Sequence, residues 1–394
     1  MTAELMQLAD RVIAQTYNRF PVVFERGEGC TLWDTQGRSY IDFVAGIAVC
    51  SLGHCHPAVS AAVADQARQL CHVSNLYYTI PQTRLAEMLV SRSFADRVFF
   101  CNSGAEANEA AIKLARKYFY EKGEPGRTRI ISMEQSFHGR TMAALSATGQ
   151  DKIRKGFDPL LGGFEFIPYN NIGALENAMD ASVCAVMMEP VQGEGGVICP
   201  DPGFVQKVRR LCDDNGVLLI FDEVQTGMGR TGTLFGYEHS GVAPDIMSLA
   251  KALANGLPIG AMLAVEEVAS AFGPGAHAST FGGGPLVTAA ALATLGTLTN
   301  DDVVGHCAAM GTYFKSKLQG LKEKHGCVEA VRGQGLLVGL KLKQEAGSLV
   351  TRCMEEGFLI NCIQDSVLRF VPPLIIGKSQ IDALVDCLDN LLSE

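Results

Sequence analysis

Residues 217–225 read VLLIFDEVQ and residues 245–251 read DIMSLAK, and these two stretches decide the fold. In each of them an apolar run ends abruptly at a charged residue, Asp222 in the first and Lys251 in the second. A short apolar run bounded by turn residues predicts a strand buried on both faces, as in a parallel sheet covered by helices. In open α/β sheets, residues just past the carboxyl ends of such strands face the ligand crevice. We therefore expect Asp222 and Lys251 to hold one ligand between them.

An acid and an amine that face one ligand are the arrangement used by pyridoxal-phosphate enzymes, in which a carboxylate meets the pyridine nitrogen and a lysine forms an imine. Either residue alone is more often a helix cap or a solvated charge. The two together, with a phosphate-binding feature elsewhere in the chain, favour the ligand interpretation.

That feature follows a predicted strand at residues 97–101, where residues 102–117 read NSGAEANEAAIKLARK. Small and polar residues at the start of a long helix leave its backbone N–H groups free to meet an anion, and the helix dipole favours negative charge there. Ser103 adds a hydroxyl donor, and Gly104 allows close approach of the backbone. Simple N-capping by Asn102 or Ser103 is the alternative.

Composition narrows the class of protein. A chain of 394 residues suggests two or three domains. The net charge of −9 and the lack of a Lys/Arg-rich run argue against a nucleic-acid partner. Apolar stretches fall short of the roughly 18 residues that span a membrane, and the N-terminus resembles no signal or transit peptide, so we expect a cytoplasmic protein with no membrane partner.

The thirteen cysteines do not indicate disulfides or metal. They are scattered among apolar neighbours and form no Cys-x-x-Cys pair, so we expect buried, reduced thiols at positions such as Cys71. Residues 54–56 (HCH) are the one place where ligand types crowd together. Adjacent residues cannot all turn toward one ion, so we predict no metal site.

The order of predicted elements indicates an α/β protein. Strands and helices alternate from about residue 95 to residue 250, which predicts a large, mostly parallel sheet flanked by helices. The segments outside it predict a smaller α+β domain. We place an N-terminal segment at residues 1–50, contributing to that small domain, a large ligand-binding domain at 51–285, and the C-terminal part of the small domain at 286–394.

Several further side chains are candidates for the site. Phe137 could cover one face of a heterocycle, and Arg140 could grip a carboxylate through two hydrogen bonds. Glu189 and Glu194 lie in one glycine-rich loop, where we expect them to pair with cations. Arg369 stands inside an apolar strand, and a charge there must be paired or functional.

Residues 227–232 (GMGRTG) match the G-x-G-x-x-G pattern of dinucleotide-binding proteins. That site needs a helix opening at the glycines and an acid about 20 residues on, at the tip of the next strand. Residues 233–239 show no helical pattern. NAD binding is therefore only a distant alternative.

The ordered motifs of the chain resemble those of class III (fold type I) pyridoxal-phosphate aminotransferases. The resemblance runs from about Tyr17 to Pro373. It rests on motifs at residues 17–21 (YNRFP), 52–57 (LGHCHP), 74–78 (SNLYY), 101–108 (CNSGAEAN), 136–140 (SFHGR), 189–194 (EPVQGE), 221–227 (FDEVQTG), 249–251 (LAK) and 370–373 (FVPP).

The resemblance implies a cofactor, pyridoxal 5'-phosphate, and residues to bind it. Lys251 would form the imine with its aldehyde, and Asp222 would keep its pyridine nitrogen protonated. Ser103, Gly104 and Ala105 would contact the phosphate, Phe137 would cover the ring face, and Gln225 would bond the phenolic oxygen. In a homodimer, Thr280 would contact the phosphate bound by the other subunit.

The resemblance also implies an activity, the transfer of the δ-amino group of N2-acetylornithine to 2-oxoglutarate in arginine biosynthesis. Ornithine, succinylornithine, N-succinyl-diaminopimelate and 4-aminobutyrate are alternative amino donors, and a catalytically silent scaffold is a distant alternative. The implied substrate contacts are Arg140, Ser279 and Arg369 for carboxylates, Glu194 as the partner that opens and closes the Arg369 site, and Tyr17 beside the acyl group.

Overall fold

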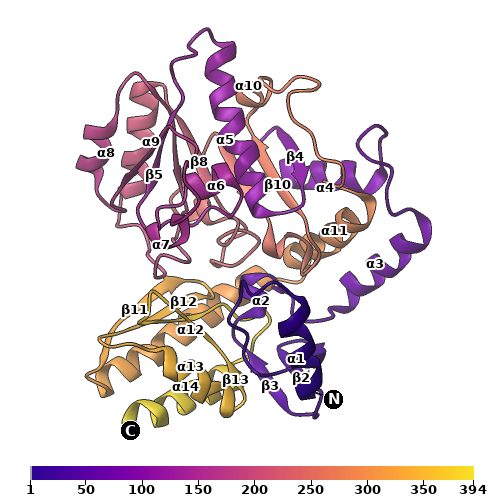
Figure 1. Ribbon diagram of the computed structural model, residues 1–394, viewed down its shortest axis with the longest axis vertical. Helices are drawn as coiled ribbons and strands as arrows, with labels where there is room; N and C mark the ends of the chain where they lie inside the picture. Colours follow the sequence, from indigo (N-terminus) through magenta and orange to yellow (C-terminus); the bar gives the residue numbers. More distant parts are fainter. Residues whose placement is uncertain (1) are drawn as a thin grey trace.

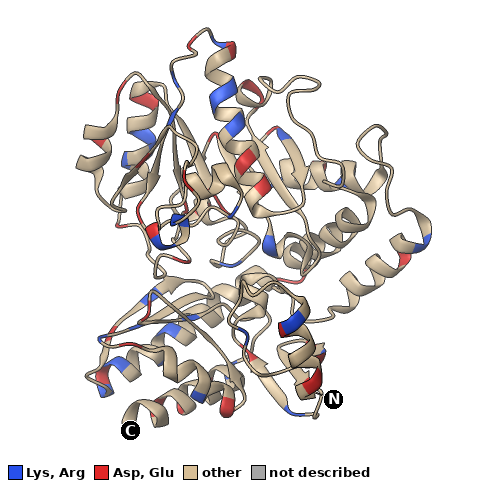
Figure 2. Ribbon diagram, viewed as in Figure 1, with Lys and Arg blue, Asp and Glu red and all other residues tan. Residues whose placement is uncertain are grey.

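The computed structural model describes residues 2–394. Figure 1 shows two halves, one built on a large sheet flanked by helices and the other, below it in the view, holding both chain termini. Figure 2 shows that Lys, Arg, Asp and Glu lie mostly on helices, loops and strand ends, and that the central strands of the large sheet carry few of them. This distribution is typical of a sheet with both faces covered.

The large sheet has seven strands. In spatial order they are β4 (Arg97–Cys101), β10 (Gly260–Ala264), β9 (Ile246–Leu249), β8 (Leu218–Asp222), β7 (Val183–Met188), β5 (Arg129–Met133) and β6 (Phe164–Ile167). Strands β9, β8, β7, β5 and β6 are parallel, while β10 is antiparallel to both of its neighbours. Every residue of β7, β8 and β9 is buried. The predicted α/β class with a mostly parallel central sheet is confirmed.

Helices cover this sheet, and their sequences explain their bounds. In α9 (Phe204–Asn215) the buried residues recur along one face, and the helix ends at Gly216, whose φ of 59° suits glycine. The other helical elements of this half are α3 (Pro57–Gln69), α4 (Ile80–Val90), α5 (Gly104–Glu121), α6 (Met142–Ser146), α7 (Asp151–Arg154), α8 (Ile172–Ala178), η1 (Gly236–His239), η2 (Lys251–Ala254), α10 (Glu266–Ala269) and α11 (Pro285–Asn300).

The second half combines the two ends of the chain. One sheet has the order β1-β2-β3-β13 and the other β11-β12-β15-β14. The parallel pairing of Ile41 with Phe358 joins an N-terminal strand to a C-terminal one. The bounds are α1 (Thr2–Val12), β1 (Phe24–Glu28), β2 (Thr31–Asp34), β3 (Ser39–Asp42), α2 (Ala45–Ala48), α12 (Val303–Lys324), β11 (Val328–Gln334), β12 (Leu337–Leu342), α13 (Gly347–Glu355), β13 (Phe358–Leu359), β14 (Asn361–Ile363), β15 (Val367–Phe370) and α14 (Lys378–Ser393). The domain boundaries given above stay a prediction.

Asp42 organises the point where β3 reaches the junction between the halves. One oxygen of this buried carboxylate accepts hydrogen bonds from the N–H groups of Val44 (2.8 Å) and Ala45 (2.9 Å), and the other bonds His54 Nε2 at 2.8 Å. The next turn is left-handed, because Ala45–Ala48 all have φ between 49° and 67°. Three of these four residues are not glycine, so the turn is strained and depends on its anchors.

The cysteines and the residues 54–56 can now be placed. All thirteen cysteines, which lie among the described residues, are free thiols. Cys71 and Cys55 are exposed, so the expectation that the thiols are buried is wrong for these two, which lie in surface loops. Within residues 2–394 no group of three or more His, Cys, Asp and Glu side chains could hold a metal ion.

Across the described part of the chain, no helix combines the length and the hydrophobicity that crossing a bilayer requires. The cytoplasmic location stays a prediction.

The His54–Asp42 pair predicts a pH dependence of stability. The hydrogen bond to Asp42, with a smaller contribution from Cys50, raises the pKa of His54 to about 10. The ordinary value is about 6.5, so the folded protein holds a proton that the unfolded chain releases, and the contribution of this pair is lost as pH rises between those values. Urea unfolding of wild type and His54→Gln should therefore differ most near about pH 6 and least near about pH 10. A difference that does not change with pH contradicts this assignment.

Candidate active site

Parallel strands β8 and β9 bring the two defining charges to one edge of the sheet. Asp222 ends β8 and pairs with Ser248 of β9, and Lys251 follows three residues later. Lys251 has a φ of 43°, a left-handed conformation that is uncommon for a residue other than glycine. The chain thus turns sharply at the end of β9. Asp222 and Lys251 line the same cavity.

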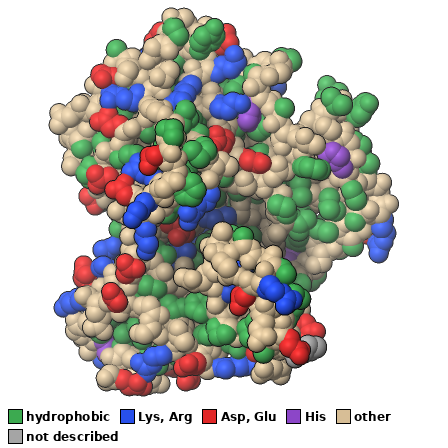
Figure 3. Space-filling model, viewed as in Figure 1, with side chains coloured by type: hydrophobic (Ala, Val, Ile, Leu, Met, Phe, Trp, Pro, Cys, Tyr) green, Lys and Arg blue, Asp and Glu red, His purple; other side chains and the backbone are tan. Residues whose placement is uncertain are grey.

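That cavity has a volume of about 410 Å³. Figure 3 shows the surface hollowed between the two halves of the molecule, with acidic and basic side chains inside the hollow. The lining contains nine of the residues predicted from the sequence, namely Ser103, Gly104, Ala105, Phe137, Arg140, Glu194, Asp222, Gln225 and Lys251. They lie at or shortly after the ends of β4, β5, β7, β8 and β9, so the sheet gathers them at the carboxyl ends of its strands.

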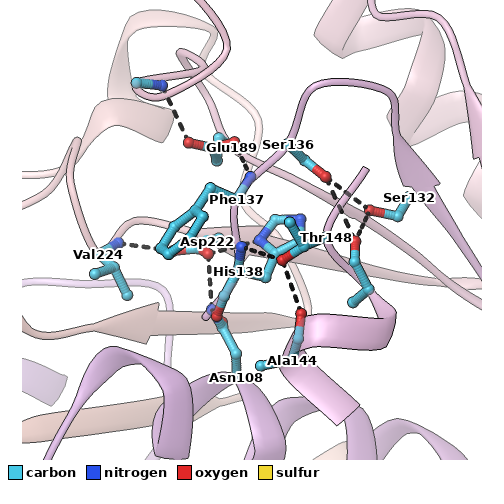
Figure 4. Close-up of polar contacts among 12 residues, drawn as sticks. Asn108, Ser132, Ser136, Phe137, His138, Ala144, Thr148, Glu189, Asp222 and Val224 are labelled. Carbon is cyan, nitrogen blue, oxygen red and sulfur yellow. Dashed lines mark hydrogen bonds and ion pairs between the residues drawn. The ribbon is translucent and has the colours of Figure 1, made fainter. Parts of the chain in front are cut away.

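Asp222 is held by a buried network (Figure 4). Its Oδ2 accepts a hydrogen bond from Asn108 Nδ2 at 2.7 Å and lies 2.7 Å from His138 Nδ1, while Oδ1 accepts from the Val224 N–H at 3.0 Å. Burying a carboxylate is costly unless it is hydrogen-bonded, and these contacts fix its orientation toward the cavity. Sequence reasoning did not identify Asn108 or His138 as site residues.

Signals for both residues existed in the sequence. His138 lies between Phe137 and Arg140 in the same loop, and Asn108 lies one helical turn beyond Gly104. Neither signal says which way a side chain turns. Among the described residues, Asn108 Oδ1 and His138 Nε2 are buried without a hydrogen-bond partner.

Glu189 does not pair with a cation in the way that its loop suggested. Its carboxylate accepts hydrogen bonds from the N–H groups of Gly193 (3.1 Å) and Phe137 (3.3 Å). Burial, opposed in part by His138 and reinforced by Asp222, raises the pKa of Glu189 to about 7. The expectation of a cation partner is therefore wrong for Glu189, because backbone amides occupy its oxygens.

Glu194, in contrast, forms an ion pair with Arg369 Nη1, and the same nitrogen donates to Gln225 Oε1 at 3.2 Å. Arg369 is 1% exposed, and this ion pair agrees with the expectation that a charge in an apolar strand is paired or functional. Burial raises the pKa of Glu194, but Arg369 and Lys251 outweigh burial and lower it overall. Burial lowers the pKa of Lys251, partly offset by Glu194. A less protonated amine is a better base and nucleophile.

The N-terminus of α5 also lines the cavity. Ser103 caps this 18-residue helix by accepting a hydrogen bond from the Glu106 N–H at 3.2 Å. A Cβ on Gly104 would lie 2.7 Å from a methyl group of Val224, so only glycine fits. The first N–H groups of a helix have no intrahelical partner, and the dipole places partial positive charge there.

Four predicted residues are not part of the cavity lining. One is Arg369, which contacts the lining residues Glu194 and Gln225. The others are Ser279, Thr280 and Tyr17. Ser279 is adjacent to the lining, because its Oγ accepts hydrogen bonds from Asn102 Nδ2 (3.2 Å) and the Gly282 N–H (3.0 Å). Thr280 is exposed. Tyr17 is also exposed and lines a second, larger cavity of about 980 Å³ beside α1. Within one chain, these residues do not complete the site.

The donor set fits a phosphorylated pyridine derivative. Asp222 offers an anion for a ring nitrogen, Lys251 offers an amine, and the start of α5 offers N–H groups for a phosphate. Phe137 adds an aromatic ring, over which the Arg140 guanidinium lies 5.6 Å from the centroid. All of these groups line one cavity.

Comparison with known proteins agrees with this geometry. The family model Aminotransferase class-III matches residues 12–392. The chain belongs to the class-III aminotransferases. Acetylornithine aminotransferase of Caldanaerobacter subterraneus subsp. tengcongensis is 52% identical over 385 residues, which are 98% of each chain.

Solved aminotransferase structures share the whole fold. The ornithine aminotransferase of Toxoplasma gondii, whose structure contains PLP at partial occupancy in the active site, has a TM-score of 0.96 and 35% identity, covering 100% of this chain and 94% of that one. Acetylornithine aminotransferase of Elizabethkingia anophelis has a TM-score of 0.90 and 34% identity, covering 100% of this chain and 99% of that one.

The Asp222 network predicts the effect of removing His138. His138→Phe leaves a buried carboxylate with one hydrogen-bond partner fewer, and it should lower the free energy of unfolding by about 3 kcal/mol. Urea unfolding of the cofactor-free protein measures the change. The control is His72→Phe, the same substitution at an exposed position, which should stay within about 0.5 kcal/mol of wild type. Equal effects at the two positions contradict the network.

Proposed function

We propose that this chain transfers the δ-amino group of N2-acetylornithine to 2-oxoglutarate, a step of arginine biosynthesis, with pyridoxal 5'-phosphate as cofactor. The observation that carries the proposal is the meeting of Asp222 and Lys251 in one cavity beside a helix N-terminus. The substrate choice is supported by the curated relatives, which are acetylornithine aminotransferases at about 50% identity over nearly the whole chain.

The cofactor would be held by groups that line one cavity. When bound, it supplies an electron-withdrawing ring that acidifies the C–H bond next to the substrate amine. Asp222 would keep the ring nitrogen protonated, because Asn108 and His138 hold its carboxylate in place. Ser103, Gly104 and Ala105 would meet the phosphate. Phe137 would lie on the ring face and Gln225 at the phenolic oxygen.

Lys251 would have two roles, attachment of the cofactor and proton transfer. Its amine lies at the end of β9, in the cavity that Asp222 also lines. Because burial lowers the pKa of Lys251, more of the amine is in the form that accepts a proton from the substrate carbon. The amine would take up this proton only after the substrate amine has displaced it, and it would then hold the proton at Nζ.

Two arginines would orient the substrates. Arg140 at the mouth of the cavity would bind the carboxylate far from the reacting amine, with Ser279 beside it, so that the terminal amine reaches Lys251. Arg369 would bind the carboxylate next to the reacting carbon of glutamate or 2-oxoglutarate. Glu194 forms an ion pair with Arg369 in this structure, so an incoming carboxylate must displace Glu194. Tyr17 would face the acyl group.

We also propose a homodimer in which Thr280 reaches the phosphate bound by the other subunit. Asn75 Nδ2 donates to the carbonyls of Ser279 (2.9 Å) and Gly282 (3.0 Å), which joins the loop that carries Thr280 to residues 74–78. Large apolar side chains are exposed along this surface, namely Leu76, Tyr77, Tyr78, Ile80 and Phe281. Hydrophobic residues gather on the same side in Figure 3. An apolar patch of this kind typically marks a protein interface.

The amino-donor preference tests the function. Purified enzyme loaded with pyridoxal phosphate should convert N2-acetylornithine and 2-oxoglutarate with a kcat/KM at least about tenfold above that for ornithine, succinylornithine, N-succinyl-diaminopimelate or 4-aminobutyrate, because an acyl pocket discriminates by one or more kcal/mol. Release of glutamate measures the rate. A preference for free ornithine would overturn the substrate while leaving the cofactor chemistry in place.

Lys251→Ala is the control for the chemistry. The variant should lose the yellow absorbance that borohydride traps and lose turnover with every donor, because no other amine lines the cavity in the described residues. Enhanced NADH fluorescence with no such absorbance would instead support an oxidoreductase.

Mixed dimers test the contribution of Thr280. The mixed dimer combines a Lys251→Ala subunit with a Thr280→Ala subunit. If Thr280 acts across the interface, both substitutions affect the same site, and the second site should keep wild-type cofactor affinity. Titration with pyridoxal phosphate, compared with the two parent homodimers, measures this. If Thr280 acts within its own subunit, both sites of the mixed dimer carry a defect. If Thr280 has no role, the Thr280→Ala homodimer itself binds the cofactor as wild type does. In both cases the mixed dimer gains no site that the parents lack.

A further inference from the structure

The glycine-rich stretch at residues 227–232, which matches a dinucleotide-binding pattern, has another role in this structure. It follows the cavity residues Asp222 and Gln225 in the same loop and crosses to the second half of the molecule. Gly229 and Gly232 have φ values of 88° and 89°. A Cβ on Gly232 would lie 3.0 Å from the Cβ of Ala308 in α12, so this loop packs tightly against the second half.

Arg230 lies at the centre of that contact and is fully buried. Its Nη1 donates to the carbonyls of Leu336 (3.0 Å) and Pro372 (2.6 Å), and Nη2 donates to Ser51 Oγ at 3.3 Å. The carbonyl of Arg230 itself accepts from the Leu336 N–H at 3.0 Å. Within residues 2–394, no carboxylate forms an ion pair with this guanidinium. Burial lowers the pKa of Arg230 to about 10, opposed in part by Cys307 and Asp42, so the group stays charged at neutral pH.

A buried cation without an anionic partner is a costly way to join two halves of a protein. Apolar side chains of the same volume would stabilise such a junction at least as well. A guanidinium differs in that its planar donors fix several acceptors at set positions at once. We therefore expect Arg230 to fix the positions of its acceptors more than it stabilises the fold.

The segments that Arg230 fixes are those that carry Arg369. Pro372 follows Arg369 by three residues, and Leu336 directly precedes β12, in which Gly339 pairs with Arg369. Arg369 in turn contacts Gln225, five residues before Arg230 in the same loop. The loop thus contacts the second half at two points. Gln225 makes one contact at the cavity, and Arg230, five residues further along the chain, makes the other.

We propose that Arg230 is a positioning residue that sets Arg369 at the distance from Lys251 and Asp222 that a substrate carboxylate requires. The proposal rests on the proposed function, in which Arg369 receives that carboxylate. Releasing the carbonyl of Pro372 would let the end of β15 move relative to the cavity. A guanidinium displaced by an ångström loses much of its bidentate contact with a carboxylate, while cofactor contacts from the first half remain.

Glutarate, an unreactive five-carbon dicarboxylate, is the probe. Calorimetric titration of the cofactor-loaded dimer should show about tenfold weaker glutarate binding in Arg230→Lys, because one ammonium cannot hold two carbonyls and a hydroxyl together. The KM for 2-oxoglutarate should rise by about the same factor with kcat nearly unchanged, and the cofactor absorbance should match wild type. Arg230→Gln, which carries no buried charge, should also weaken glutarate binding. This variant replaces Arg230→Lys in the test if the lysine variant does not fold.

A double-mutant cycle separates positioning from general destabilisation. In an Arg369→Lys background, Arg230→Lys should weaken glutarate binding less than about twofold, because the group it positions is already changed. The matched control is Arg209→Lys, at a partly buried arginine that pairs with Asp245 away from the cavity, and it should leave glutarate binding as in wild type.

Each other result is decisive. Equal losses in both backgrounds, a similar loss in Arg209→Lys, or wild-type affinity in both Arg230 variants overturns the positioning role. Failure of the proposed function is a different result, in which the wild-type enzyme itself neither binds glutarate nor transaminates N2-acetylornithine.

Discussion

The pairing of β8 with β9 is the constraint on which the site depends. Their parallel register sets Asp222 opposite Ser248, three residues before Lys251, so two charges distant in the sequence reach one cavity. Both strands are buried on both faces, and a shift of register would move every side chain of either strand to the opposite face. The hydrophobic core of the sheet thus fixes the relative positions of Asp222 and Lys251.

The second requirement is that charges near this cavity keep their hydrogen bonds. Asp222 is held by Asn108 and His138, and Glu194 is held by Arg369. In a medium of low dielectric, an unpaired charge costs several kcal/mol, so each charge has its position set by its partner. The partners come from different loops and from both halves of the chain, which makes the site a connection between those halves as well as a binding pocket.

Much of the fold could be predicted from local sequence. The strands predicted at residues 97–101 and within residues 217–225 and 245–251 coincide with β4, β8 and β9, because an apolar run between turn residues has few other stable structures in a protein of this size. Other features could not be predicted. The left-handed turn at Ala45–Ala48 contradicts the preference of alanine and isoleucine, and it forms because Asp42 and the surrounding contacts hold it. Glu189 met backbone amides instead of a cation, which no spacing of charges reveals.

By itself the sequence determined the buried strands of the large sheet, the family resemblance and the candidate site residues, because these depend on short-range pattern and residue type. The tertiary structure alone decided which of those residues share a cavity. It placed Arg369 against Glu194 and Gln225, left Thr280 exposed, and turned the glycine-rich stretch at residues 227–232 into a contact between the halves. Those outcomes follow from the packing of segments far apart in the chain, where side-chain direction and burial are set by neighbours that no local pattern specifies.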